Sequence, residues 1–139
     1  EPAKNEKSPI KKSQEGTNKS VPSNKILKSE TLDTLKGHLS HTDIKQMLDE
    51  VITKNDEIIQ AMNQALSEDK KSDLSARGHE MKGMAGNFGL IEISEQAAKI
   101  EARAKTDATI VLAGLLDPLP EMQKRAKEAL NQWLDRNKD

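Results

Sequence analysis

The chain has 139 residues, of which 34% are hydrophobic and 32% are charged, and this length accommodates one domain and a tail. With one Phe, one Trp and no Tyr, the core must be built from aliphatic residues and Met, which favours an all-α domain. A net charge of −1 and so few aromatic side chains give no basis for binding nucleic acid or a membrane surface, and without Cys there is no disulfide or thiolate metal site.

The first part of the chain differs in composition from the rest. Residues 1–30 are rich in Lys, Ser, Asn and Pro, and their few apolar residues show no period. We predict a flexible linker over residues 1–30 and one helical domain over residues 31–139. A basic arm that binds a partner is the alternative for the linker. The sequence shows no signal peptide and no apolar run long enough to span a bilayer. Because it begins at Glu1 rather than Met, we expect a piece of a longer protein.

Two helices are predicted next along the chain. Three Leu residues at helical spacing predict a short helix over residues 31–39. A longer helix is predicted over residues 43–66, with Thr42 or Asp43 as its N-cap. Its apolar stripe is interrupted only by Asn55, so this helix should lie at the centre of the domain.

Residues 71–87 are predicted to form a helix that carries one histidine on its solvent side. At about 100° per residue, His79 falls roughly 160° away from Met81, which lies on the apolar face. The neighbours of His79 on the far face are small, and Lys82 flanks them. These small residues are Ser72, Ser75, Ala76, Gly83 and Gly86.

The glycines of this helix require an explanation, because glycine costs about 1 kcal/mol relative to alanine in a helix interior. Gly78, Gly83 and Gly86 all fall within this one helix. We interpret them as a bare track, meaning a strip of helix surface without side chains, along which a bulky group can approach the imidazole of His79. A nucleophilic imidazole that meets a phosphoryl group on another protein has this requirement. Gly89 is the expected helix stop, since glycine tolerates a positive φ.

The remaining residues predict three more helical segments. Apolar residues at helical spacing indicate helices over residues 92–105 and 108–116. Pro118 and Pro120 exclude an unbroken helix, so we predict a new start with Asp117 as N-cap and an end near Arg136. Four main helices with short links predict an all-α, up-down four-helix bundle with a short N-terminal helix and a proline break before the last helix.

The stretch from Gly78 to Leu90 resembles the signature of histidine-containing phosphotransfer (HPt) domains of multistep phosphorelays. The family pattern is a small residue, His, any residue, an apolar residue, Lys and Gly, then small residues and another Gly before an apolar residue. The matching residues are Gly78, His79, Met81, Lys82, Gly83, Gly86, Asn87, Phe88, Gly89 and Leu90. Gly78 is a mild departure, because Ala is usual there. A looser similarity of helix order covers roughly residues 31–136.

The resemblance implies a phosphorelay intermediate and not an enzyme that uses ATP. His79 would accept a phosphoryl group from an aspartate of a receiver domain and pass it to another receiver aspartate. Lys82 would neutralise the phosphoryl oxygens. The implied docking face for a response-regulator receiver comprises small or polar residues. They are Ser72, Ser75, Ala76, Gly83, Gly86 and Asn87.

The same resemblance sets expectations for cofactors, partners and location. No metal or other cofactor is expected in this domain, and Mg²⁺ is expected on the partner receiver. Apart from the resemblance, we expect a monomer, since one bundle can close its own core, and the composition gives no basis for nucleic-acid binding or direct membrane contact. The implied location is cytoplasmic, as the C-terminal part of a hybrid sensor kinase or a similar relay protein of the inner membrane.

Three alternatives compete with this interpretation. A histidine-kinase dimerisation segment also has His followed by Glu, but its motif continues to a proline where this chain has Met84. A zinc peptidase helix needs a second His at the position of Gly83, and His38 and His41 alone complete no metal site. A plain helical interaction module has no need for the glycines around His79.

Overall fold

The computed structural model describes residues 23–138 of the chain, and this part contains seven α-helices and no strand. The predicted all-α fold is confirmed. The helices are α1 (Ser23–Ile26), α2 (Ser29–Lys36), α3 (His41–Ser67), α4 (Lys71–Asn87), α5 (Ile91–Arg103), α6 (Thr109–Leu116) and α7 (Leu119–Arg136).

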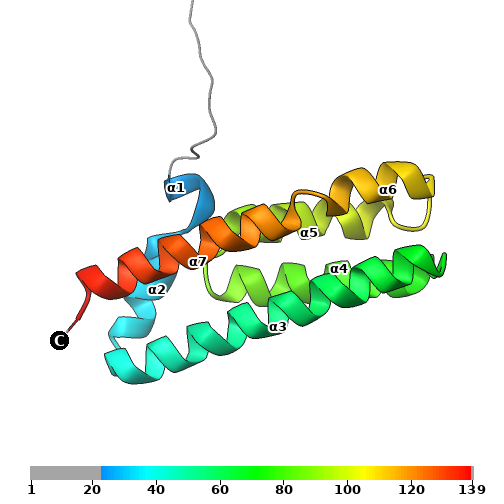
Figure 1. Ribbon diagram of the computed structural model, residues 1–139. Helices are drawn as coiled ribbons and strands as arrows, with labels where there is room; N and C mark the ends of the chain where they lie inside the picture. The colour runs from blue at the N-terminus through cyan, green and yellow to red at the C-terminus, as the bar shows by residue number, and fades with distance from the viewer. Residues whose placement is uncertain (1–22, 139) are drawn as a thin grey trace, which may run out of the picture.

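Four of these helices form the bundle. α3 packs against α4 and α7, and α5 packs against the same two helices, so the four surround one core (Figure 1). Short turns join α3 to α4 and α4 to α5, as an up-down arrangement requires. α6 contacts α3 and α5 and precedes α7 along the same side of the bundle, while α1 and α2 lie at one end (Figure 1).

The core is aliphatic along the length of α3, where the predicted stripe faces inward. Ile44, Leu48 and Met62 are almost completely buried, and Trp133 of α7 closes the same core. Asn55 is also fully buried, and neither its amide nitrogen nor its amide oxygen has a hydrogen-bond partner. The interruption of the stripe seen in the sequence therefore lies inside the bundle.

The predicted boundary between linker and domain is wrong for residues 23–30. Ile26 and Leu27 are buried in the core, and the amide of Lys28 donates a hydrogen bond of 2.7 Å to the carbonyl of Gly89. Two adjacent apolar residues show no periodicity, which is why the sequence pattern did not reveal this contact. The linker prediction for residues 1–22 lies outside the described residues.

The predicted caps of two helices are also wrong. Ser40, and not Thr42 or Asp43, is the N-cap of α3, because its hydroxyl accepts a hydrogen bond of 3.1 Å from the amide of Asp43. Asp117 has helical backbone angles and ends α6 instead of starting α7. An N-cap residue typically has an extended conformation, and α7 begins only after Pro118.

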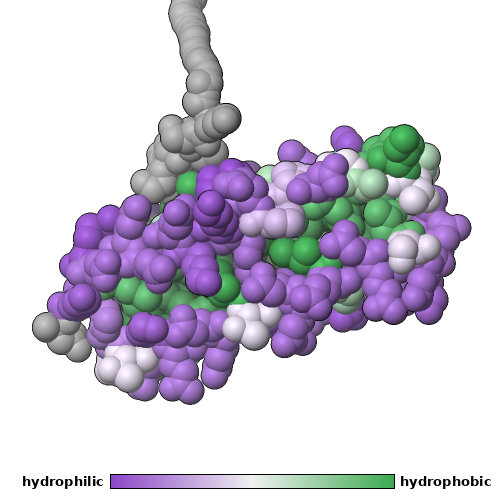
Figure 2. All heavy atoms as spheres, viewed as in Figure 1, coloured by the Kyte–Doolittle hydropathy of each residue, from purple (hydrophilic) through white to green (hydrophobic). Residues whose placement is uncertain are grey.

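The surface of the described part is mostly polar, with one apolar exception on α6. Ile110 is 82% exposed and Val111 is 45% exposed, and α6 carries the apolar atoms at one end of the molecule in Figure 2. No described helix is both long enough and apolar enough to cross a membrane. Within residues 23–138, no group of three or more His or acidic residues could hold a metal ion.

Candidate functional site

His79 projects from the middle of α4 into solvent. Its side chain is 71% exposed, whereas Met81, two residues later, is completely buried. α4 spans Lys71–Asn87, which matches the predicted helix. The prediction that His79 lies on the solvent side of its helix is confirmed.

Glu101 of α5 holds His79 and Lys82 together. The Nδ1 atom of His79 lies 2.8 Å from one carboxylate oxygen of Glu101, and the Nζ atom of Lys82 lies 2.8 Å from the other. The Glu101 side chain is 27% exposed, so this carboxylate is partly withdrawn from water. Lys82 is therefore positioned by an ion pair, and sequence reasoning did not identify Glu101.

The charge of Glu101 determines which nitrogen of His79 is available. The ammonium of Lys82 lowers the pKa of the Glu101 carboxyl below its usual range, partial burial opposes this, and the hydrogen bond with His79 adds to the lowering. An ionised carboxylate only accepts hydrogen bonds, so Nδ1 of His79 must be the donor. In the neutral imidazole, the lone pair is then on Nε2, the nitrogen that the carboxylate leaves free.

Gly78 explains how α5 comes close enough to supply this carboxylate. A Cβ atom at Gly78 would lie 2.9 Å from the amide nitrogen of Glu101 and 3.1 Å from the carbonyl oxygen of Ala97. Such distances leave no room for a side chain, and Gly78 is buried. The interpretation of Gly78 as part of the bare track is therefore wrong, because this glycine lets the backbones of α4 and α5 approach each other.

The other two glycines lie where the sequence placed them. A Cβ atom at Gly83 would have no neighbour within 4 Å. One at Gly86 would make only an ordinary contact of 3.4 Å with Oγ of Ser94. Both glycines are exposed, so no side chain projects from these two positions of the surface next to His79.

The remaining residues of the predicted docking face do not all share this exposure. Ser72, Ala76 and Asn87 are exposed. Ser75 is partly buried, and its hydroxyl donates a hydrogen bond of 3.3 Å to the backbone carbonyl of Glu101. Ser75 thus belongs as much to the contact between α4 and α5 as to the open face.

The family model described as Hpt domain matches residues 46–136, from α3 to the last residue of α7. This chain belongs to the Hpt domain family. The match decides for the HPt resemblance over the kinase, peptidase and plain interaction alternatives. A search of curated proteins and one of solved structures gave no match.

Membership of the Hpt family defines the broad activity of the chain. Hpt domains are phosphotransfer intermediates of phosphorelay signalling, they interact with receiver domains, and they are not classical enzymes. The matched region contains all of α4 and α5, and with them the contact between His79 and Glu101. α1 and α2 lie before the matched residues.

One signal in the sequence points to Glu101 once the hairpin is considered. α4 ends at Asn87, Gly89 follows with φ of +77°, and the amide of Leu90 donates a hydrogen bond of 2.8 Å to the carbonyl of Ala85. This confirms the predicted stop. In an antiparallel hairpin, residues at similar distances from the turn lie opposite each other, so polar residues about ten positions into α5 are candidates to face His79.

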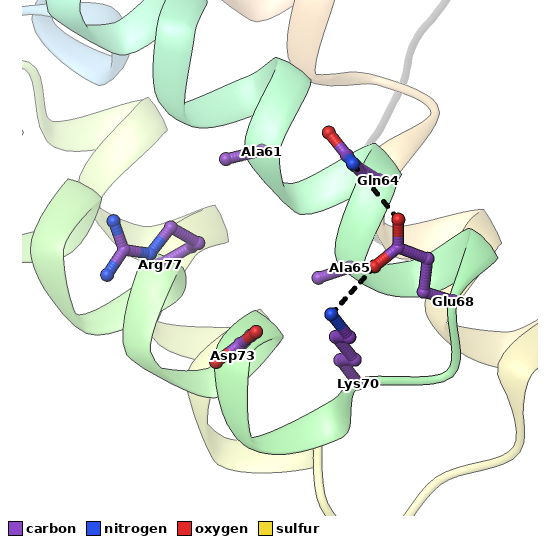
Figure 3. Close-up of a pocket in the computed structure, with 7 residues that line it drawn as sticks. All are labelled: Ala61, Gln64, Ala65, Glu68, Lys70, Asp73 and Arg77. Carbon is purple, nitrogen blue, oxygen red and sulfur yellow. Dashed lines mark hydrogen bonds and ion pairs between the residues drawn. The ribbon is translucent and has the colours of Figure 1, made fainter.

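A hollow between α3 and α4 is separate from His79. It measures about 330 Å³, lies between the C-terminal end of α3 and α4, and includes Arg77 and Asp73 (Figure 3). Glu68 in this hollow accepts one hydrogen bond from Gln64 and pairs with Lys70, and Arg77 pairs with Glu80 at 2.8 Å. The hollow contributes no group that contacts His79.

Proposed function

We propose that this Hpt domain is a phosphorelay intermediate in which Nε2 of His79 accepts a phosphoryl group from a receiver-domain aspartate and passes it to another receiver aspartate. One observation carries the proposal. The imidazole is exposed, its Nδ1 is held by Glu101, and bare backbone at Gly83 lies beside it. The reaction needs no ATP bound to this domain.

The proposed transfer balances in charge and atoms. The lone pair of Nε2 attacks phosphorus, a P–N bond forms, and the P–O bond to the donor aspartate breaks to release a carboxylate. The Nδ1 proton stays on the ring, which becomes positively charged. Glu101, at 2.8 Å from Nδ1, stabilises this charge as it forms. Transfer to the next receiver reverses these steps.

Lys82 is proposed to balance the charge of the phosphoryl group. It follows His79 by one helical turn and is held on the same side through Glu101. Because phosphoryl transfer proceeds with charge spread over the equatorial oxygens, a nearby ammonium lowers the barrier by electrostatic attraction. The Mg²⁺ that assists such transfers is expected on the receiver.

The proposed docking surface for the receiver is the open face of α4. It comprises Ser72, Ala76, Gly83, Gly86 and Asn87, with Ser75 at its edge. Uncharged, small side chains allow a second protein to approach the imidazole without displacing bulky groups. We further propose that the chain acts as a monomer in the cytoplasm, as part of a hybrid sensor kinase or a similar relay protein.

In the test, a receiver domain that carries an isotopically labelled phosphoryl group is incubated with this chain. The label transferred to the chain is then analysed. Acid-labile, alkali-stable label is expected on the wild type and absent from His79→Gln, because glutamine has no nucleophilic ring nitrogen. His38→Gln, which removes another exposed histidine, should retain the label. Label that survives in His79→Gln, or label that appears from ATP alone, would contradict the proposal.

A further inference from the structure

The carboxylate that holds His79 also affects the phosphoryl group after it has arrived. Resting on the function proposed above, we infer that Glu101 shortens the lifetime of phosphorylated His79 and so favours onward transfer over storage. Three features of the described residues support this role: the fixed position of the carboxylate, the proton that it holds on the ring, and its competition for Lys82.

The position of Glu101 is fixed from several sides. Its backbone amide lies against Gly78, where no side chain fits, and its backbone carbonyl accepts a hydrogen bond from Ser75. Its two carboxylate oxygens are occupied by His79 and Lys82 at 2.8 Å each. The negative charge therefore stays beside the imidazole when the ring is modified.

The first effect concerns the proton on Nδ1. A carboxylate that accepts from Nδ1 favours retention of this proton after Nε2 has been phosphorylated. The ring is then a cation, and its departure leaves a neutral imidazole. When the P–N bond breaks, its electron pair returns to Nε2, and the phosphoryl group goes to an aspartate oxygen or to water. A protonated ring is the better leaving group, so Glu101 keeps the phosphorylated ring in the form that loses the phosphoryl group more readily.

The second effect concerns the charge of the phosphoryl group. Its negative oxygens arrive near the Glu101 carboxylate, which is already paired with Lys82. The single ammonium of Lys82 must then neutralise both the carboxylate and the phosphoryl group. Repulsion between these anions raises the free energy of the phosphorylated state relative to the free imidazole. Both effects act in the same direction, toward release of the phosphoryl group.

Glu101→Gln separates this role from simple orientation of the ring. The amide oxygen of glutamine still accepts from Nδ1 and has nearly the same shape, but the negative charge is lost. If Glu101 only orients His79 and positions Lys82, the substitution leaves the protonation of the phosphorylated ring unchanged. If its charge shortens the lifetime of the phosphorylated state, the substitution lengthens that lifetime.

The experiment uses the full chain, phosphorylated with phosphoramidate so that labelling does not depend on docking, and counts only label that His79→Gln lacks. We expect the label to persist about threefold to tenfold longer on Glu101→Gln than on the wild type, a factor typical of one nearby charge in a partly exposed site. Transfer to a receiver should slow by a similar factor. Glu95→Gln, the same change at an exposed position of α5, should behave as the wild type.

A spectroscopic measurement distinguishes charge from structure. The ¹⁵N resonance of Nδ1 in the phosphorylated ring should report less protonation in Glu101→Gln than in the wild type at the same pH. Lys82→Met gives an independent test in the equilibrium of transfer with a receiver, because removal of the shared ammonium leaves the repulsion uncompensated and should shift the phosphoryl group toward the receiver.

The outcomes separate the two proposals. Absence of label at His79 in the wild type would overturn the phosphotransfer role itself. A labelled wild type with an unchanged or shorter lifetime in a folded Glu101→Gln would overturn the inference about Glu101 and leave the phosphotransfer role intact. If Glu101→Gln does not fold, a transfer equilibrium in Lys82→Met that is not shifted toward the receiver would overturn the inference in the same way.

Discussion

At the scale of single residues, the reactivity of His79 depends on a carboxylate that stands 22 positions later in the chain. Glu101 selects the tautomer of the imidazole and positions Lys82 at the same time. A helical wheel places His79 and Lys82 on one side of α4, but it contains no information about α5. The wheel therefore predicted the exposed histidine and missed the group that makes Nε2 the available nitrogen.

The first prediction at this scale concerns pH. Because Lys82 and His79 both favour the ionised carboxylate, the pKa of Glu101 is lower in the folded than in the unfolded chain. This contact therefore stabilises the folded domain at pH values above the ordinary pKa of glutamate. The contribution is lost as the pH falls through the lowered pKa of the folded state. A ¹³C titration of the Glu101 carboxyl should show a midpoint below that of an ordinary glutamate.

Lys82→Met is the control for this titration. The hydrogen bond from Lys82 is the largest cause of the lowered pKa, so its removal should move the midpoint of Glu101 upward. A wild-type Glu101 that titrates in the usual range would contradict the ion pair, and with it the positioning of Lys82.

At the scale of elements, α4 uses its glycines for two different purposes. Gly78 is buried and permits contact with α5, whereas Gly83 and Gly86 leave the outer face open. The sequence shows only that all three weaken the helix. Which glycine faces a neighbour depends on where α5 packs, and that is a property of the helix pair.

The prediction for α4 uses a matched pair of glycines. Gly83 of α4 and Gly114 of α6 are both exposed, and a Cβ atom at either would meet nothing within 4 Å. Leu has a higher helix propensity than Gly by roughly 0.8 kcal/mol, so Gly83→Leu and Gly114→Leu should each keep or slightly raise the melting temperature. Only Gly83→Leu should weaken binding to a receiver, by about tenfold or more, since a bulky side chain then stands beside His79.

Binding can be measured by calorimetry and folding by circular dichroism. Unfolding of Gly83→Leu would show that this face is packed. Equal loss of receiver binding in both variants would place the docking surface elsewhere.

At the scale of the whole molecule, the domain begins earlier than its sequence pattern indicates. Leu27 is buried, and the following residue is hydrogen-bonded to Gly89 in the turn between α4 and α5. A side chain at Gly89 would also collide with the carbonyl of Lys28, at 2.6 Å. The segment before α2 is thus built against the end of the helix that carries His79.

Leu27→Ala should therefore destabilise the domain. Removal of a buried leucine side chain costs about 2–5 kcal/mol of unfolding free energy, which urea denaturation can measure. Ile110→Ala removes a side chain that is 82% exposed and should change stability by less than about 0.5 kcal/mol. A similar, small effect of both substitutions would mean that residues before α2 do not belong to the folded unit.

The amino-acid sequence by itself determined the helical class, the extent of α4, the outward direction of His79 and the stop at Gly89. These features follow from local periodicity and backbone preference, which operate within a few residues. Only the tertiary structure decided that Glu101 reaches His79, that Gly78 faces α5, that Ser40 caps α3 and that Leu27 belongs to the core. Except for the cap, where several neighbouring residues were chemically suitable, these features join segments distant in the chain, and no local pattern encodes which distant segments meet.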